Sequence, residues 1–116
     1  MRRVMIGLFL VALTVPLSAW SYVAFEQVTV TATAIGFTAA TINQGNGHPG
    51  AAIAVCRLET AQIRYRLDGT APTSSVGTLL EIGDYLTLSG SDLLVNFSAI
   101  RTGSSSGVLD CNYFTP

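Results

Sequence analysis

Alternation of apolar and polar side chains is the feature that most limits the folds open to this chain. In Gln27–Ile35 every second position is apolar, at Val28, Val30, Ala32 and Ala34. Threonines fill the positions between them. Successive side chains of a strand point to opposite faces of a sheet, so this period of two predicts a half-buried β-strand.

Similar patterns continue to the end of the chain and predict about seven or eight short strands in one domain, residues 22–116. The expected strands are Gln27–Ile35, Phe37–Ile42, Ala51–Glu59, Ala61–Leu67, Thr78–Ile82, Tyr85–Leu88, Asp92–Arg101 and Gly107–Phe114. No helix is expected in this domain, and the Gly- and Asn-rich segment Asn43–Gly50 favours a loop. Short strands with turn signals about every 8–12 residues are typical of an antiparallel β-sandwich, of immunoglobulin-like or jelly-roll type.

The charge balance excludes one class of partner. Charged residues make up only 11% of the chain, and lysine is absent. From Tyr22 onward, four arginines are outnumbered by seven acidic residues, a net charge of about −3. Nucleic-acid binding needs a basic patch or stripe, so we expect neither DNA nor RNA as a partner.

The first 21 residues have the pattern of a secretory signal. Two arginines precede the apolar run Val4–Leu13, and the small residues Ala19 and Ser21 favour cleavage before Tyr22. The run is shorter than the roughly 20 residues of a membrane-spanning helix, so no stable span is expected. Two alternatives stay open, an uncleaved anchor and an extension from a misassigned start.

The stretch "RYRLDGTAPT" is the most patterned part of the domain. Asp68-Gly69 supplies the positive φ that a tight turn needs, which predicts the corner that ends a strand. Arg64, Arg66 and Asp68 share one face by parity, so we expect them to point outward and to form surface ion pairs worth about 0–1 kcal/mol. The alternative hypothesis is that this row, together with Arg101, contacts a ligand or a partner.

The two cysteines, Cys56 and Cys111, are both placed in predicted strands. Cys111 shares a face with Leu109 and Tyr113 and is expected to point inward. In an exported chain the pair could form a disulfide worth roughly 4 kcal/mol, whereas in a reducing cytoplasm the cysteines are two small buried apolar residues. Because both neighbourhoods read as ordinary core strands, the sequence favours free thiols.

No catalytic or cofactor site is expected. His48 is the only histidine, it lies in the Gly-rich loop, and neither an acid nor a nucleophile is near it in sequence. A metal site needs several ligands, and a Ser-His-Asp site needs a held and oriented histidine. The residues therefore favour a non-enzymatic protein without cofactors.

Two resemblances bear on function. Glu59–Tyr113, with "IRYRLDGTAPT", "GTLLEIGD" and "AIR", resembles a family of small all-β proteins of tailed bacteriophages. That resemblance implies an accessory virion component, such as a capsid decoration or head–tail protein. Its partners would be other virion proteins, such as the major capsid protein, or copies of itself in a homo-oligomer. A signal-like segment departs from this pattern, because such virion proteins assemble in the cytoplasm.

The same stretch, "IRYRLDGTAPT", is also similar to a turn of the form "IYYTLDGSEPT" in the immunoglobulin-like C-terminal domains of bacterial chitobiases and related secreted glycosidases. This second resemblance covers about eleven residues. It implies a secreted, periplasmic or cell-surface module that supports binding to glycan or cell wall.

Overall fold

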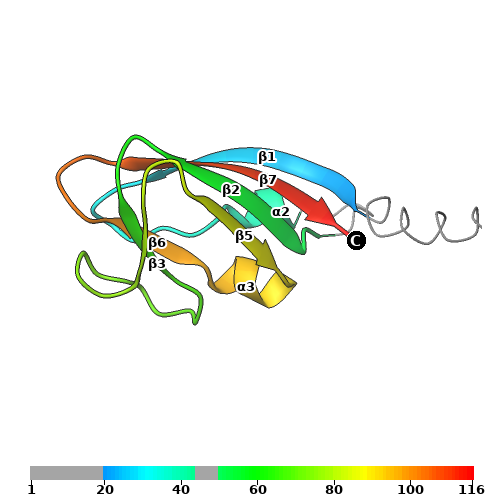
Figure 1. Ribbon diagram of the computed structural model, residues 1–116. Helices are drawn as coiled ribbons and strands as arrows, with labels where there is room; N and C mark the ends of the chain where they lie inside the picture. Colours follow the sequence, from blue (N-terminus) through cyan, green and yellow to red (C-terminus); the bar gives the residue numbers. More distant parts are fainter. Residues whose placement is uncertain (1–19, 44–49) are drawn as a thin grey trace, which may run out of the picture.

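The computed structural model describes residues 20–43 and 50–116, which form an all-β sandwich of two antiparallel sheets (Figure 1). Most of the predicted signal segment and of the loop that carries His48 lies outside these residues. The elements in chain order are β1 (Ser21–Val30), α2 (Ala39–Ile42), β2 (Ile53–Glu59), β3 (Ile63–Arg66), β4 (Thr78–Leu80), β5 (Tyr85–Ser89), α3 (Ser91–Asn96), β6 (Ser98–Arg101) and β7 (Gly107–Thr115).

The strands divide between a four-stranded sheet, in the order β1-β7-β2-β5, and a three-stranded sheet, in the order β4-β3-β6. Every pair of neighbouring strands is antiparallel. An immunoglobulin constant domain also divides seven strands as four and three, but there the last strand pairs with the sixth. Here β7 lies between β1 and β2, so the last strand joins the first sheet instead.

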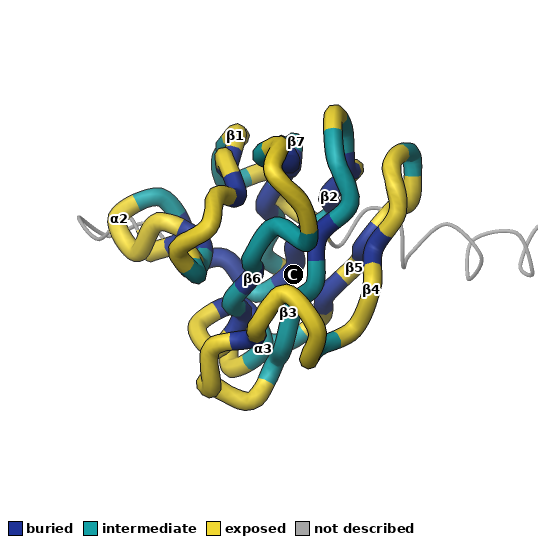
Figure 2. The backbone as a smooth tube through the Cα atoms, turned by 90° about the vertical axis from the view of Figure 1, so that its left-hand side faces the viewer, coloured by how far each residue is buried: buried dark blue, intermediate teal, exposed yellow. Residues whose placement is uncertain are grey.

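The core lies between the two sheets. Alternate residues of the four-stranded sheet point into it, and Leu58 of β2 lies directly opposite Leu109 of β7, both fully buried. The three-stranded sheet contributes Ile63, Leu80 and Ala99. Figure 2, which looks along the strands, shows buried residues gathered on the strands and exposed ones on the connecting loops. Burying one such leucine contributes about 1.5–3 kcal/mol.

Five of the predicted strands are confirmed. Those expected at 51–59, 61–67, 78–82, 85–88 and 107–114 correspond to β2, β3, β4, β5 and β7, with bounds that differ by at most two residues. Their inward positions are the ones that the alternation predicts, as in β5, where Leu86 and Leu88 are buried between exposed neighbours.

The predicted strand Gln27–Ile35 ends early, at Val30. Its inward prediction holds for Val28 and Val30, but Ala32 is exposed. Beyond Val30 the chain leaves the four-stranded sheet and crosses toward β6, where Ile35 forms an isolated bridge with Ala99. The alternating pattern continues across this crossing, which is why the sequence alone did not show where the strand ends.

The predictions of a strand at Phe37–Ile42 and of a domain without helices are wrong. Ala39–Ile42 forms the one-turn helix α2, with Ile42 buried. The ring of Phe37, just before it, stacks on Phe97 with centroids 4.2 Å apart. Both Phe37 and Ile42 are buried, whereas a continuous strand would point these two side chains to opposite faces, because they are five residues apart.

The predicted strand Asp92–Arg101 is also divided. Its first half is α3, and only Ser98–Arg101 forms a strand, β6. Gly90, with φ of 130°, precedes the helix, and the acidic Asp92 lies in its first turn, where a negative charge is favourable. The helix buries Leu94 while Val95 is 71% exposed, so the three apolar residues in a row are not an alternating strand.

Candidate interaction surfaces

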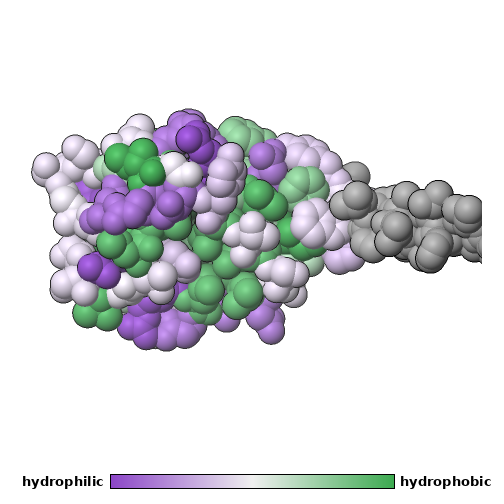
Figure 3. All heavy atoms as spheres, viewed as in Figure 1, coloured by the Kyte–Doolittle hydropathy of each residue, from purple (hydrophilic) through white to green (hydrophobic). Residues whose placement is uncertain are grey.

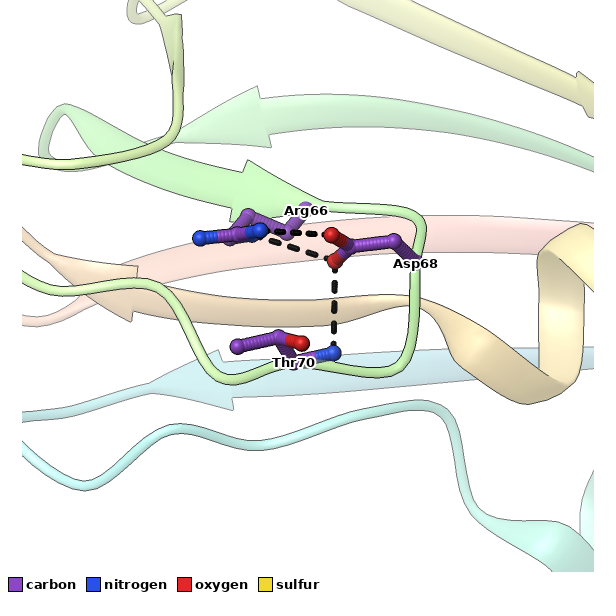
Figure 4. Close-up of polar contacts among 3 residues, drawn as sticks. All are labelled: Arg66, Asp68 and Thr70. Carbon is purple, nitrogen blue, oxygen red and sulfur yellow. Dashed lines mark hydrogen bonds and ion pairs between the residues drawn. The ribbon is translucent and has the colours of Figure 1, made fainter.

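The Asp68-Gly69 corner follows β3, and the Asp68 carboxylate accepts three hydrogen bonds (Figure 4). The N–H of Gly69 also donates to the backbone oxygen of Asn96, at 3.3 Å. Arg66 binds the Asp68 carboxylate in two places, with Nε 3.1 Å from Oδ1 and Nη2 2.5 Å from Oδ2. The backbone N–H of Thr70 donates to Asp68 Oδ1 at 3.2 Å. Gly69 has φ of +80°, the conformation that the sequence predicts for this position.

These contacts shift the acid–base equilibria of both side chains. The hydrogen bonds from Arg66 and then from the Thr70 N–H lower the pKa of Asp68 to about 2. The hydrogen bonds that Arg66 donates to Asp68, and then the negative charge of Asp68, raise the pKa of Arg66. The Arg66 and Asp68 side chains are 32% and 54% exposed, so solvent screens the pair and it contributes little to stability, but each charge has its partner within the turn.

Arg64 has a different role from the one that strand parity suggests. Its Nε donates to the backbone oxygen of Ser74 at 3.2 Å, and its Nη1 donates to that of Gly77 at 2.9 Å. The hydroxyl of Thr73 accepts the N–H groups of Ser75 and Val76 inside the same loop. Arg64 therefore fastens the loop between β3 and β4 to β3, instead of pointing freely to solvent.

Two shallow hollows border this loop. One, of ≈ 310 Å³, is lined by the residues Tyr65–Asp68 and Val76–Thr78. The other, of ≈ 450 Å³, lies where Pro72–Ser74 meets Ile100–Gly103. Arg101 lines this second hollow, and its side chain forms no hydrogen bond or ion pair within residues 20–43 and 50–116.

The residues predicted to form one interface row do not form one surface. Across β3 and β6, Arg64 lies opposite Ile100, whereas Arg101 lies opposite the buried Ile63. Because directly opposed residues share a face, Arg101 is on the other side of the three-stranded sheet from Arg64 and Arg66. Arg64 therefore holds the loop between β3 and β4, and Arg66 pairs with Asp68. Arg101 lies on the opposite side of the sheet from both.

The surface that the sequence reasoning missed is the outer face of the four-stranded sheet, the side turned away from the core. Four large side chains on it are exposed, namely Trp20 (47%), Tyr22 (59%), Phe25 (54%) and Tyr85 (70%). The rings of Trp20 and Tyr22 lie 5.5 and 5.7 Å from that of Phe114. In the view of Figure 3, apolar residues lie exposed over β2 and β5, among polar ones. Aromatics at outward positions of the alternation were the signal that could have found this face.

Polar side chains cross the same face in register. The residues directly opposed across β1, β7, β2 and β5 form one row: Gln27, Asp110, Arg57 and Tyr85. Gln27 Nε2 donates to Asp110 Oδ1 at 2.8 Å, and Arg57 lies 3.4 Å from Glu59 and 5.9 Å from the centre of the Tyr85 ring. The face therefore combines an aromatic end, around Phe114, with a row of polar and charged side chains.

Cys56 and Cys111 form a disulfide, so the expectation of free thiols is wrong for this structure. The two residues lie directly opposite each other on β2 and β7, with Sγ atoms 2.09 Å apart. Both are buried, with 1% and 0% exposure, on the inner face of the four-stranded sheet. The bridge therefore joins the two central strands of that sheet inside the core.

A buried tyrosine and a carboxylate connect β1, β7 and the start of α2. The hydroxyl of Tyr113 donates to Glu26 Oε1 at 2.7 Å. Glu26 also accepts the backbone N–H of Thr38, at 3.2 and 3.3 Å to its two oxygens, and the Thr38 hydroxyl. Burial, and then the hydrogen bond and charge of Glu26, raise the pKa of Tyr113, which keeps its hydroxyl protonated as a donor. The arrangement fastens α2 to the sheet.

Nothing in the described ranges has the composition of a metal site, since no three His, Cys, Asp or Glu side chains gather there. The helices described, α2 and α3, are also far too short to cross a membrane. Comparison of the chain with models of protein families, with curated proteins and with solved structures finds no match.

Proposed function

We propose that this chain is a non-enzymatic structural protein that acts through surface contacts, as an accessory component of a phage virion such as a capsid decoration or head–tail protein. The observation that carries the proposal is the outer face of the four-stranded sheet, where Trp20, Tyr22, Phe25 and Tyr85 remain exposed. Large aromatic side chains are enriched at protein interfaces, so their exposure on one face marks it as a candidate contact surface.

The other surface features support a structural role for the rest of the domain. The side chains of Arg64, Arg66 and Asp68 are used within the chain, so the "RYRLDGTAPT" segment builds a rigid corner. The resemblance of Glu59–Tyr113 to phage proteins supplies the biological setting. Low charge and an exposed sheet face both suit packing against other subunits.

Mass spectrometry of virions tests this proposal. Trypsin releases the peptide Leu58–Arg64, which lies between two arginine cleavage sites. We expect this peptide to follow the capsid protein through a density gradient at a constant ratio, while host proteins do not. Its absence from purified virions that retain their other minor proteins would refute the virion role.

Two surface variants identify the face that makes the contact. Tyr85→Ser removes the most exposed aromatic of the outer face and should lower incorporation into virions at least severalfold. Val95→Ser is the matched control, because Val95 is 71% exposed on α3, away from this face, against 70% for Tyr85. Equal incorporation of both variants would show that the outer face is not the contact surface.

A second function is favoured by the disulfide Cys56–Cys111. Disulfides persist mainly in oxidising compartments, and the first 21 residues resemble an export signal. In this alternative the chain is a secreted, periplasmic or cell-surface module that supports binding to glycan or cell wall.

Export makes a distinct prediction. The mature chain should be recovered from periplasm or medium with Tyr22 as its first residue, and it should sediment with insoluble cell-wall polysaccharide. Recovery only in the cytoplasm, with Met1 or its neighbour retained, would exclude this alternative.

A further inference from the structure

The centre of the outer face carries two opposite charges that do not satisfy each other. Arg57 on β2 and Asp110 on β7 are directly opposed in register. Within the described residues they form no ion pair with each other, since Arg57 pairs with Glu59 and Asp110 accepts from Gln27. The Arg57 side chain is 48% exposed, so its charge remains available to a molecule lying on this face.

We propose that two copies of the chain stack through their outer faces about a twofold axis that runs along the strands, between β7 and β2. This inference rests on the proposed function, because it names a second copy as a partner of the same face. The reason for this axis is the strand order β1-β7-β2-β5, which the rotation reverses. It places β7 over β2 of the other copy, and β1 over β5.

This arrangement makes the face complementary to itself. Arg57 lies over Asp110 of the partner subunit, and Asp110 lies over Arg57 of the partner subunit, so one contact occurs twice. In the same row, Gln27 lies over Tyr85 of the partner subunit, an amide over a phenol that it can hydrogen-bond. The strands of sheets that pack face to face stay within about 30° of each other. Residues close to the axis, such as Arg57 and Asp110, therefore remain opposite their partners.

A twofold axis between the two faces that runs across the strands, along this row, gives the opposite result. It would place Arg57 over Arg57 of the partner subunit and Asp110 over Asp110 of the partner subunit. Like charges held together at an interface cost several kcal/mol, so the charge pattern selects the axis along the strands.

The size of the face sets the expected strength of the dimer. Four strands about 4.8 Å apart and roughly seven residues long cover on the order of 450 Å² per copy, when the sheet is counted as flat and the extra surface of protruding side chains is left out. A total on the order of 1,000 Å² is at the lower end for specific interfaces, where association is weak. We therefore expect a dimer that dissociates on dilution.

Charge reversal tests the pairing directly. The full chain and its Arg57→Asp and Asp110→Arg variants are compared by sedimentation velocity over a range of concentrations. We expect the unaltered chain to dimerise and each variant alone to dimerise at least about tenfold more weakly, because each has two repulsive contacts. An equimolar mixture of the two variants restores both attractions and should dimerise within about threefold of the unaltered chain.

The matched control is Arg101→Asp, which makes the same charge change on the three-stranded sheet and should leave association unchanged. Thermal unfolding of each variant shows whether it folds, and recovery in the mixture cannot come from unfolded chains. A chain that stays monomeric at several hundred micromolar overturns the inference, as do single variants that dimerise like the unaltered chain, or a mixture that does not recover.

These outcomes are independent of the virion experiment. A monomeric chain that is nevertheless incorporated into virions overturns the self-association and leaves the proposed function intact. A dimer with the expected charge pattern that is absent from virions supports the self-association and removes the virion role.

Discussion

The disulfide gives the most quantitative prediction. Cys56 and Cys111 are separated by 55 residues, so the bridge closes a loop that includes most of the domain. In the chain-entropy model a loop of this length lowers the entropy of the unfolded chain by about 14 cal/mol/K, which corresponds to about 4 kcal/mol at 25 °C. Small domains have a total free energy of unfolding of about 5–15 kcal/mol, so reduction should remove a large part of it.

Urea unfolding of the oxidised and the reduced chain measures this difference without any mutation. With a urea dependence of about 1–3 kcal/mol per molar, a loss of about 4 kcal/mol moves the midpoint down by roughly 1.3–4 M. The variant Cys56→Ala/Cys111→Ala should unfold near or below the reduced chain and should not respond to reductant. Coincident curves for the oxidised and reduced chain, or two reactive thiols in the unfolded protein before reduction, would refute the reasoning.

Three further changes test the core and the corner. Gly107→Ala should lower the free energy of unfolding by about 1–3 kcal/mol in urea, because its Cβ would lie 2.6 Å from Ala61 O and from Ile63 Cγ2; an unchanged midpoint contradicts this. Tyr113→Phe removes the hydrogen bond to the Glu26 carboxylate and should lower the free energy of unfolding by about 1.5–3 kcal/mol. Arg66→Ala should raise the pKa of Asp68 from about 2 toward its ordinary 3.8 in an NMR titration. Because that folded-state pKa is lowered, the stabilisation by ionised Asp68 is present above pH 3.8 and is lost as the pH falls toward 2. The variant should show a smaller loss, because the Thr70 N–H still binds the carboxylate.

Sequence alternation determined the inward and outward faces of β2, β3, β5 and β7. A residue of a strand has only two directions in which to point, so a row such as Leu86 and Leu88 reveals its buried side without knowledge of any partner. The turn at Asp68-Gly69 was predictable for a similar local reason, because positive φ favours glycine.

The short helices were not predictable by the same reasoning. Neither α2 nor α3 has more than six residues, which is too few for a helical period to stand out from the strands beside it. Tertiary contacts decide both, since α3 buries Leu94 and α2 buries Ile42. The alternating pattern therefore predicted strands in two segments, α2 and α3, that form short helices because of their contacts with the core.

Local pattern in the sequence was enough to predict the all-β class, most of the strands that carry the core and the corner after β3. The tertiary structure alone decided which strands are neighbours, because alternation specifies a face and not a partner. The placement of β7 between β1 and β2 brings Cys56 against Cys111 and Arg57 beside Asp110, residues far apart in the chain. The same register separates Arg101 from Arg64, and it collects aromatic side chains into one exposed face that no single strand reveals.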